Sequence, residues 1–429
     1  MKKREMPIQG IQFSRRSFVE RAGILLFWGA FAVIMLLHGL TVRASAQSWG
    51  NPTWSDEFNA TVPGTPPDPS KWTFDAGGDG WGNRELEVYC VTGSATPAPC
   101  NITHPNAFQD GHGHLIIQAV RTSADPAPSG TWTSARLKTL GLQDFQYGRL
   151  ESCMKLPVGA GLWPAFWMLG THGEWPTGGE MDIMENVPAT GGAGGGLGPT
   201  VIESTIHGPS MAQKGIYSLA ADFTLPNGKR IDDADPSCHV YGAIWSPFMV
   251  QIYVDDWRKP FFIRTASDVP PGGRWIFNAP FYFIMNLAVG GEWPGPPNDT
   301  TPSPSKMVVD YVRVYKPSNE NGPGMSASPI GMKGGSTGST ALRLTSLSGS
   351  GYVYLACSTE SPNATCSVDT GNSLNASAAD FSEVATQMAK VTVVRTTNSG
   401  TRLRVGPITI TAYTVSGDQS TLSIPVDNP

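Results

Sequence analysis

Three carboxylates lie close together in the middle of the chain: Glu180, Asp182 and Glu185, with apolar residues between them. The side chains of a β-strand alternate between its two faces, so Glu180 and Asp182 would share one face. Glu185 would fall on the other face unless the strand contains one extra residue. A β-bulge at residues 183–184 restores Glu185 to the face of the other two acids. The sequence therefore predicts a bulged strand with three acids on one face.

Neighbouring carboxylates repel one another, and this repulsion separates their pKa values. One acid can then stay protonated near neutral pH while another is ionised. Retaining glycoside hydrolysis needs such a pair, with the carboxyl groups about 5–5.5 Å apart. Asp182 lies between the two glutamates and can hydrogen-bond the nucleophile. Two other interpretations are a solvated acidic face, which the apolar flanks disfavour, and a calcium site, which is more typical of a loop than of a strand.

Tryptophans occur on both sides of this segment: Trp163 and Trp167 precede it in Leu-Trp-Pro-Ala-Phe-Trp, and Trp293 follows it in Gly-Glu-Trp-Pro-Gly. Tryptophan rings stack on the apolar faces of sugars, while polar side chains bind the hydroxyl groups. The neighbouring Gly and Pro residues indicate loop or cleft-edge positions for Trp163 and Trp293. Trp245, inside a strand-like run, is typical of a core residue instead.

The elements that must position these residues are predicted to be β-strands. Segments 114–119, 239–244, 250–254 and 307–315 alternate like strands, and turn residues separate them. The chain contains 49 Gly and 36 Pro, which favours turn-rich β architecture over helical bundles. We therefore expect an all-β sandwich over residues 47–316.

The composition changes after residue 316. Ser, Gly, Pro and Asn dominate residues 317–340, which is typical of a flexible linker. Strand-like segments return at 352–355, 390–394 and 407–413. They predict a small Ig-like β-sandwich over residues 341–429. This part lacks a catalytic constellation, so we expect an accessory domain that acts as a spacer or a binding module.

Residues 1–46 are predicted to be an export signal. Arg15 and Arg16 resemble a twin-arginine motif, an apolar run covers 22–40, and Ala-Ser-Ala at 44–46 is a typical cleavage site. The run is also long enough to be an uncleaved membrane anchor, but the cleavage site directly after it favours removal. We expect an exported protein, periplasmic or extracellular, with no membrane attachment in its mature form.

The formal net charge is −5, and no basic stripe occurs outside the N-terminus, which argues against a nucleic-acid partner. Six cysteines are present, and exported proteins commonly form disulfides. Cys90 with Cys100, and Cys357 with Cys366, each close a short loop and are the expected pairs; their spacing does not suggest a zinc site. Cys153 and Cys238 are expected to be small buried residues, although a bond between them stays open.

Eight ordered blocks of the sequence resemble glycoside hydrolase family 16, and within it the laminarinase-like endo-β-1,3-glucanases. The blocks are 54–58, 80–89, 133–137, 147–151, 163–170, 180–185, 286–291 and 309–315. The extra residue between the acids resembles the laminarinase, agarase and carrageenase branch of the family. Within that branch, Trp-Gly-Asn-Arg-Glu and Leu-Trp-Pro-Ala-Phe-Trp are most similar to laminarinases.

The resemblance implies a concanavalin A-like β-jelly roll with a substrate cleft on its concave face. It also implies retention of configuration through a covalent glycosyl-enzyme. At the matching positions Glu180 would be the nucleophile, Glu185 the general acid/base and Asp182 the assisting acid. The substrate contacts that the resemblance implies are Asn83, Arg136, Trp163, Trp167, His207 and Trp293. His207 would contact a sugar rather than bind a metal.

No cofactor is expected for catalysis. Some members of the family hold a structural calcium on the convex face, and the resemblance implies Glu57 and Asp310 as its side-chain ligands. The alternative is that these two acids cap turns.

Together these features predict a monomeric retaining endo-hydrolase of β-1,3-glucan, with mixed-linkage β-1,3-1,4-glucan as a second substrate. One alternative is a hydrolase of the same family that acts on another polysaccharide such as a galactan, because loop contacts determine specificity. Another is a catalytically weak glucan-binding protein, which the three intact acids disfavour.

Overall fold

The computed structural model describes residues 49–427, except 126–130, 189–195, 212–214, 248, 317–323, 333–336, 346–351, 360, 362–363, 371–377, 381–385, 396–404 and 415–418. The predicted export signal lies outside the described residues. In the described part of the chain, no helix combines the length and apolar character needed to cross a membrane.

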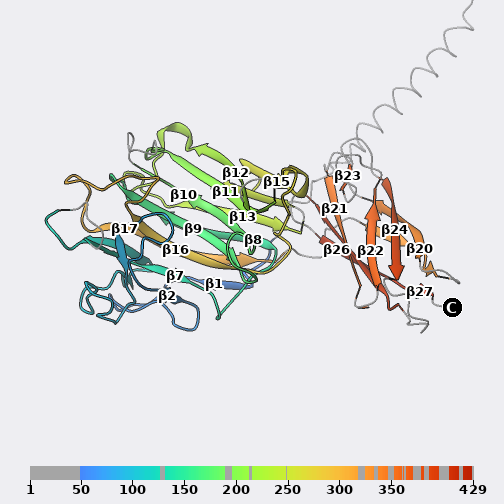
Figure 1. Ribbon diagram of the computed structural model, residues 1–429, viewed down its shortest axis with the longest axis horizontal. Coiled ribbons are helices and arrows are strands. Elements are labelled where there is room, and N and C mark those ends of the chain that lie inside the picture. The colour runs from blue at the N-terminus through green and yellow to red at the C-terminus, as the bar shows by residue number, and fades with distance from the viewer. Residues whose placement is uncertain are drawn as a thin grey trace, which may run out of the picture. The chain divides into compact units, whose positions relative to one another are not determined.

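Residues 49–316 form two large β-sheets, as the sequence predicts (Figure 1). The ten-stranded sheet has the order β15 (Phe262–Thr265), β14 (Met249–Val254), β13 (His239–Ser246), β8 (Gly148–Lys155), β17 (Ser305–Tyr315), β5 (Leu115–Arg121), β6 (Trp132–Ser134), β3 (Glu87–Tyr89), with β1 (Trp54–Asp56) beside β17 and β4 (Ala107–Gln109) beside β5. Two short 3-10 helices, η1 (Pro226–Gly228) and η2 (Ala266–Asp268), lie in the connections.

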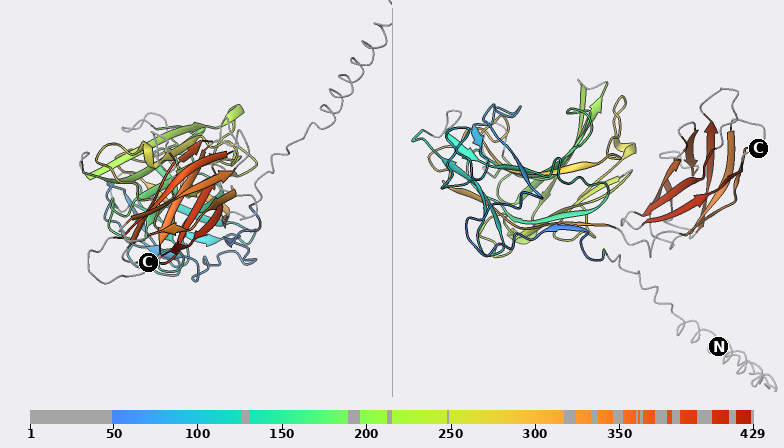
Figure 2. Two further views of the ribbon diagram at one scale, coloured as in Figure 1. Left: turned by 90° about the vertical axis from the view of Figure 1, so that its right-hand side faces the viewer. Right: turned by 90° about the horizontal axis from the view of Figure 1, so that it is seen from below.

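The seven-stranded sheet carries the acidic segment. Its order is β12 (Gly215–Thr224), β11 (Val201–Ser210), β10 (Glu180–Glu185), β9 (Leu162–Gly170), β16 (Phe281–Val289), β7 (Arg136–Lys138), β2 (Thr73–Asp75). All neighbouring strands in this sheet are antiparallel. The acidic strand is therefore central, with two strands on one side and four on the other. The strands of this part of the chain are visibly curved in Figure 2.

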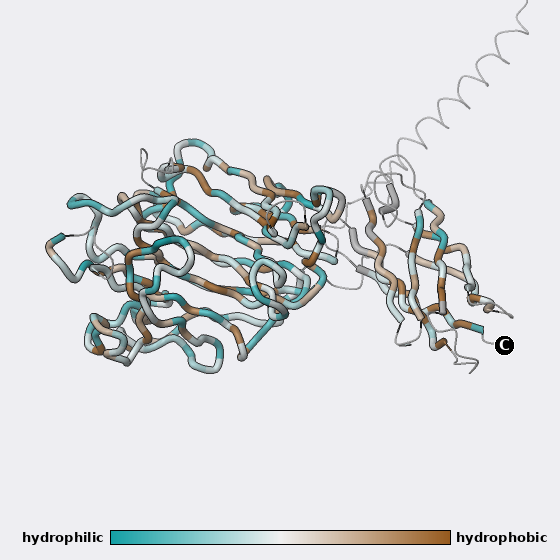
Figure 3. The backbone as a smooth tube through the Cα atoms, in the orientation of Figure 1, coloured by the Kyte–Doolittle hydropathy of each residue, from teal (hydrophilic) through white to brown (hydrophobic). Residues whose placement is uncertain are grey.

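One apolar core lies between the two sheets. Strands of both contribute fully buried side chains, among them Met181, Phe166 and Val309. Trp245 is also in this core, as predicted. Figure 3 shows apolar segments recurring along the strands. Because one face of each central strand is buried here, the other face of β10 and its neighbours is left for polar side chains.

The C-terminal part has its own sheets and its own core. One sheet has the order β18 (Gly324–Ala327), β20 (Thr337–Thr345), β24 (Thr386–Arg395), β22 (Ala364–Asp369), and the other β23 (Ala378–Asp380), β21 (Tyr352–Thr359), β25 (Ile408–Thr414), β26 (Gln419–Ile424); β19 (Ile330–Gly331) pairs with β27 (Val426–Asp427). Leu342, Val391 and Ile410 belong to a core separate from that of the larger part. The Ig-like assignment stays a prediction.

The range predicted as a linker contains strands. β18 and β19 lie within residues 317–340, and β18 pairs with β20, which also begins there. The C-terminal part therefore starts earlier than residue 341. The Gly- and Ser-rich composition concealed these strands, since short strands at a sheet edge need few bulky side chains.

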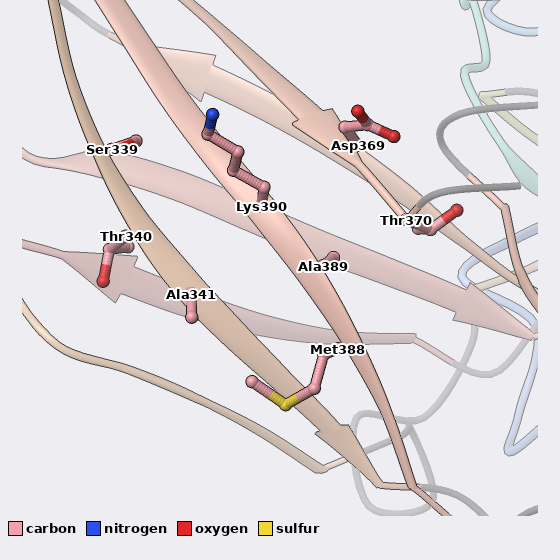
Figure 4. Close-up of a pocket in the computed structure, with 8 residues that line it drawn as sticks. All are labelled: Ser339, Thr340, Ala341, Asp369, Thr370, Met388, Ala389 and Lys390. Atoms are coloured by element: carbon pink, nitrogen blue, oxygen red, sulfur yellow. The ribbon is translucent and has the colours of Figure 1, made fainter.

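A hollow of about 540 Å³ lies on the sheet that contains β20, β24 and β22 (Figure 4). It is lined by Ser339, Thr340, Ala341, Asp369, Thr370, Met388, Ala389 and Lys390. Asp369 and Lys390 are opposite each other across β22 and β24. This lining contains no aromatic ring on which a sugar could stack and only one carboxylate, so it offers no pair of acids for glycoside hydrolysis.

Three disulfides are present. The Cys90–Cys100 and Cys357–Cys366 bonds confirm the two predicted pairs. Cys153 and Cys238, expected to be small buried residues, are instead bonded to each other, with their Cα atoms 5.5 Å apart. The pairing of β13 with β8 explains this, because Val240 is opposite Cys153 and Cys238 directly precedes β13.

Candidate active site

The predicted bulge is present in β10. The register of β10 shifts between Asp182 and Glu185 against β11, and between Asp182 and Met184 against β9. Met181, Ile183 and Met184 are buried in the core. The bulge confirms the prediction and has the expected effect, because all three acids line the same cleft.

This cleft has a volume of about 610 Å³. The structure brings together all nine residues predicted for catalysis and substrate contact, and they line it with twelve others. The lining residues are Trp81, Gly82, Asn83, Glu85, Arg136, Trp163, Ala165, Trp167, Leu169, Trp175, Glu180, Asp182, Glu185, Glu203, Thr205, His207, Ser218, Ala220, Asn286, Ala288 and Trp293.

Asp182 is the most enclosed of the three acids, with 2 % of its surface exposed. Burial raises the pKa of Asp182 well above its usual range, and the neighbouring Glu180 carboxylate raises it further. Asp182 is hydrogen-bonded to Glu180. The protonated Asp182 therefore donates to Glu180, which is the contact expected of an assisting acid.

Glu180 is the acid whose ionised form has the most partners. Burial raises the pKa of Glu180, but the charge of His207, hydrogen bonds from Trp175 and Asp182, and the charge of Arg136 all oppose that shift. These partners favour the ionised form of Glu180, which is the form that a nucleophile needs.

Glu185 is in a different electrostatic environment. Burial raises the pKa of Glu185 well above its usual range, and the charges of Asp182 and Glu180 add to the shift. The Trp163 indole Nε1 donates a hydrogen bond to Glu185 Oε1 at 3.0 Å and partly opposes it. These effects favour the protonated form of Glu185, which is the form that a general acid needs. Trp163 lies within β9 and not in a loop, but it lines the cleft as predicted.

His207 lies opposite Glu180 across β10 and β11. Its Nε2 is 3.2 Å from Asp182 Oδ2 and 3.9 Å from Glu180 Oε1, and its Nδ1 is 2.7 Å from Ser218 Oγ. His207 thus lies next to Asp182 and Glu180, in addition to lining the cleft. Ser218, which the sequence did not single out, fixes the orientation of its ring.

Glu180, Asp182 and His207 offer ligand atoms that all lie within 4.8 Å of one another. Calcium prefers six to eight oxygen ligands, and this group supplies two carboxylates and one nitrogen. The calcium interpretation of the acidic strand therefore does not fit.

A chain of buried and partly buried hydrogen bonds forms the wall of the cleft at β16 and β9. Trp167 Nε1 donates to Asn286 Oδ1 (2.7 Å), and Asn286 Nδ2 donates to the Tyr89 hydroxyl (3.0 Å). The Tyr89 hydroxyl donates to Glu85 Oε2 (3.1 Å), and Asn83 Nδ2 donates to Glu85 Oε1 (3.0 Å). These bonds fix Asn83 and Trp167, two of the predicted contacts. Tyr89 and Asn286 lie in blocks that resemble the family, but their mutual contact had no signal in the sequence.

Arg136 lies between two tryptophans at the β7 side of the cleft. Its guanidinium is 4.8 Å from the Trp167 ring centre and 5.0 Å from that of Trp81. Its Nε is 3.0 Å from Asp75 Oδ2. Trp293 meets Trp163 edge to face with ring centres 5.3 Å apart. The predicted tryptophans thus form rigid walls on which a glycan can stack.

The two residues expected to bind calcium lie away from this cleft. Both oxygens of Glu57 accept hydrogen bonds from Arg313, at 2.9 and 2.6 Å. The only cluster of potential metal ligands that includes Asp310 among the described residues contains Cys153 and Cys238, which are bonded to each other. The side chain of Glu57 is therefore occupied by Arg313 and does not fit the role of a calcium ligand.

A cleft with two glutamates and an aspartate, in which burial raises the pKa of one glutamate and hydrogen-bonding partners favour the ionised form of the other, is typical of a glycoside hydrolase. The chain belongs to glycosyl hydrolase family 16, because residues 100–313 match the family described as Glycosyl hydrolases family 16 and a relative matches over most of its length. That relative is a Beta-glucanase of Rhodothermus marinus, 37 % identical over 271 residues, which are 61 % of this chain and 84 % of the relative.

Two other curated relatives are longer than the matched region. A Glucan endo-1,3-beta-glucosidase A1 of Niallia circulans is 35 % identical over 62 % of this chain and 38 % of its own length. A Keratan-sulfate endo-1,4-beta-galactosidase of Sphingobacterium multivorum is 31 % identical over 61 % of this chain and 54 % of its own length.

Solved structures show the same similarity. An endo-beta-1,3-glucanase from Pyrococcus furiosus is 38 % identical, with a TM-score of 0.50 over 62 % of this chain and 94 % of that chain. The laminarinase catalytic domain from Thermotoga maritima is 35 % identical, with a TM-score of 0.51 over 63 % of this chain and 99 % of that chain. The expected jelly-roll fold and family are thereby confirmed.

Proposed function

We propose that this enzyme cleaves internal β-1,3 linkages of laminarin-type glucan with retention of configuration, and that mixed-linkage β-1,3-1,4-glucan is a second substrate. The observation that carries the mechanism is the bulged strand β10, which directs Glu180, Asp182 and Glu185 into one cleft. The named activities of the Rhodothermus, Niallia, Pyrococcus and Thermotoga proteins support the substrate.

In the first step the protonated Glu185 gives its proton to the glycosidic oxygen while a Glu180 oxygen attacks the anomeric carbon. The bond to the leaving sugar breaks, and a glycosyl ester of Glu180 forms. In the second step Glu185, now ionised, takes a proton from water, whose oxygen displaces Glu180 at the same carbon. Asp182 donates its hydrogen bond to Glu180 and stabilises the carboxylate each time it is free.

The test is reducing-sugar release by residues 47–429 from laminarin, lichenan, xyloglucan and agarose, with Glu180→Gln as the matched inactive variant. Laminarin should be cut by the wild type and not by the variant, and the first product should have the β-configuration by NMR. Cleavage of agarose alone would keep the mechanism and overturn the substrate. Binding of laminarin without cleavage of any glycan would favour a glucan-binding protein.

A galactan-cleaving enzyme is the second candidate. The similarity to the keratan-sulfate galactosidase of Sphingobacterium multivorum is the observation that favours it. The glucanases named above are more similar in sequence, and the chain covers more of the Rhodothermus relative, so the glucan substrate is preferred.

We also propose that the enzyme is exported and acts as a monomer. Three disulfides in the described residues support export, because such bonds persist in oxidising compartments. N-terminal sequencing of the protein from the periplasm or the medium tests the cleavage after Ala46, and a sedimentation mass near that of one chain tests the monomer.

A further inference from the structure

The cleft is not electrically uniform along its length. At the β7 side the cationic Arg136 lies beside Trp81 and Trp167. At the β11–β12 side two acids, Glu203 and Asp222, lie directly opposite each other on neighbouring strands. Neither belongs to the catalytic trio, and the mechanism gives them no step.

Strand alternation places this acid pair on the cleft face. In β11, Ile202, Ser204 and Ile206 are buried, while Glu203 and Thr205 line the cleft with His207. In β12, Ser218 and Ala220 line it, and Asp222 is the next residue on that face. Asp222 is exposed and Glu203 is half-buried. The pair therefore lies on the β11–β12 side of the cleft, with Glu203 in its lining.

The pair is also in line with the acid/base. Glu203 is opposite Glu185 in the register of β10 and β11. Burial raises the pKa of Glu203, and its hydrogen-bonded neighbour Asp222 raises it further. Two acidic side chains are therefore concentrated at one position next to Glu185.

In the part of the chain that the structure describes, no ion pair within 4.0 Å involves Glu203 or Asp222; the charge of His207, on the same face of β11, lowers the pKa of Glu203 but is a smaller effect than burial and Asp222. Arg264, the cation that contacts β12, donates to the backbone oxygen of Ala220 at 2.7 Å. Like charges directly opposite on paired strands are destabilising. Such a pair at the edge of a binding cleft can discriminate between ligands by repulsion.

We propose that Glu203 and Asp222 select against anionic glycans, so that the enzyme takes neutral β-1,3-glucan chains and excludes those that carry sulfate or carboxylate groups on the sugars bound over β11 and β12. This inference rests on the proposed function, and names the charge class of its substrate. A neutral glucose unit can still donate its hydroxyl groups to the same carboxylates, whereas a sulfate would meet the negative charge of the pair.

The test compares one backbone in three charge states: laminarin, sulfated laminarin and an aminated, cationic laminarin. The variant is the isosteric pair Glu203→Gln with Asp222→Asn, and Glu203→Gln alone is the second variant. The matched control is Asp233→Asn with Asp299→Asn, which removes the same two charges from exposed side chains that do not line the cleft. Thermal unfolding of each protein establishes that it is folded.

We expect kcat/KM on sulfated laminarin to rise by about tenfold in the double variant at low ionic strength, and kcat/KM on the cationic substrate to fall. The control variant should change neither. The difference between the wild type and the variant should shrink in 1 M salt, where the screening length is about 3 Å.

An unchanged rate on sulfated laminarin would overturn the proposal. The proposal would also be overturned if kcat/KM on unmodified laminarin fell in the variant while kcat/KM on sulfated laminarin stayed the same. The pair would then serve to bind neutral glucan. Failure of the proposed function looks different: the wild type would cut none of the three laminarins but would cut another neutral glycan, on which the same charge series can be repeated.

Discussion

The two β-sheet parts of this chain bury different kinds of side chain. All 21 buried polar or charged side chains of the described residues lie in residues 49–316, and the described C-terminal core is apolar. Burying a polar group costs stability unless it is hydrogen-bonded, and burying a charge costs more. In the larger part, some of these costly buried groups lie at the cleft. Glu85, Asp182 and Asn286 are all buried there.

The difference shows how fold and function are separated in the chain. A core of aliphatic side chains is sufficient to hold two small sheets together, as in the C-terminal part. The jelly roll adds buried carboxyls that must find hydrogen-bond donors or stay protonated, and several of these carboxyls line the cleft. Buried polar groups therefore locate the function better than the hollow in Figure 4, whose lining holds no pair of acids.

The largest expected effect is at the nucleophile. Glu180→Gln keeps the size of the side chain but removes the attacking oxygen, so kcat on laminarin should fall on the order of 10⁴-fold or more. Asp369→Asn, in the C-terminal hollow, is the matched control and should leave kcat unchanged. Near-normal activity of the Glu180→Gln enzyme would contradict the assignment of Glu180 as the nucleophile.

The second expected effect is a loss of stability in the C-terminal part that leaves the activity unchanged. Leu342 is fully buried in the C-terminal core. Leu342→Ala should therefore lower the stability of that part by about 2–5 kcal/mol. Calorimetry and limited proteolysis would measure the loss, while kcat/KM on laminarin stays that of the wild type. A parallel loss of laminarin cleavage would show that the activity depends on the stability of the C-terminal part.

The sequence was sufficient to predict β10 because its period is visible locally. Strand alternation left Glu185 on the wrong face, and a single inserted residue was the simplest repair. For Trp163 the predicted place in the cleft is confirmed, but the loop that the neighbouring Pro indicated is not present, because the residue pairs within β9. Proline is compatible with a strand when its missing N–H is not needed by the ladder.

Contacts between distant strands could not be predicted in this way. Asn286 bonds to Tyr89 across 197 residues of sequence, and Cys153 bonds to Cys238 across 85. Both depend on which strands become neighbours and in which register, and one sequence contains no direct signal for either. Glu203 and Ser218 were missed for the same reason, since only the pairing of β10, β11 and β12 brings them to the acids.

The cost of a buried carboxyl can be measured at Glu87, which is fully buried. Its Oε2 accepts a hydrogen bond from the Val289 N–H at 2.7 Å. Burial raises the pKa of Glu87 well above its usual range, and the neighbouring Glu85 adds to the shift. A carboxyl whose folded-state pKa is raised contributes stability below its unfolded pKa, and this contribution is lost as the pH rises towards the folded pKa.

Glu87→Gln removes that titration while keeping an oxygen for Val289. The variant should match the wild type at pH 4 and exceed it at pH 8, with a gain in Tm of about 2–4 °C for each 1 kcal/mol. Thermal unfolding at the two pH values measures it. If the variant and the wild type differed in Tm by the same amount at both pH values, Glu87 would not titrate on unfolding. Burying this carboxyl would then add no pH-dependent cost to the stability of the larger part.

The smallest expected effect is a shift in the pH profile from Trp163. Its indole N–H stabilises ionised Glu185, so it lowers the pKa of Glu185 against the larger effect of burial. Trp163→Phe removes the donor and keeps an aromatic ring. The pKa of Glu185 should then rise, and the alkaline limb of the kcat profile, where the general acid loses its proton, should move up by about one pH unit. The KM for laminarin should also rise if the ring stacks on a sugar, but only the displaced limb reports the hydrogen bond. A limb that stays in place while KM rises would mean that Trp163 serves substrate binding alone, and that burial by itself keeps Glu185 protonated.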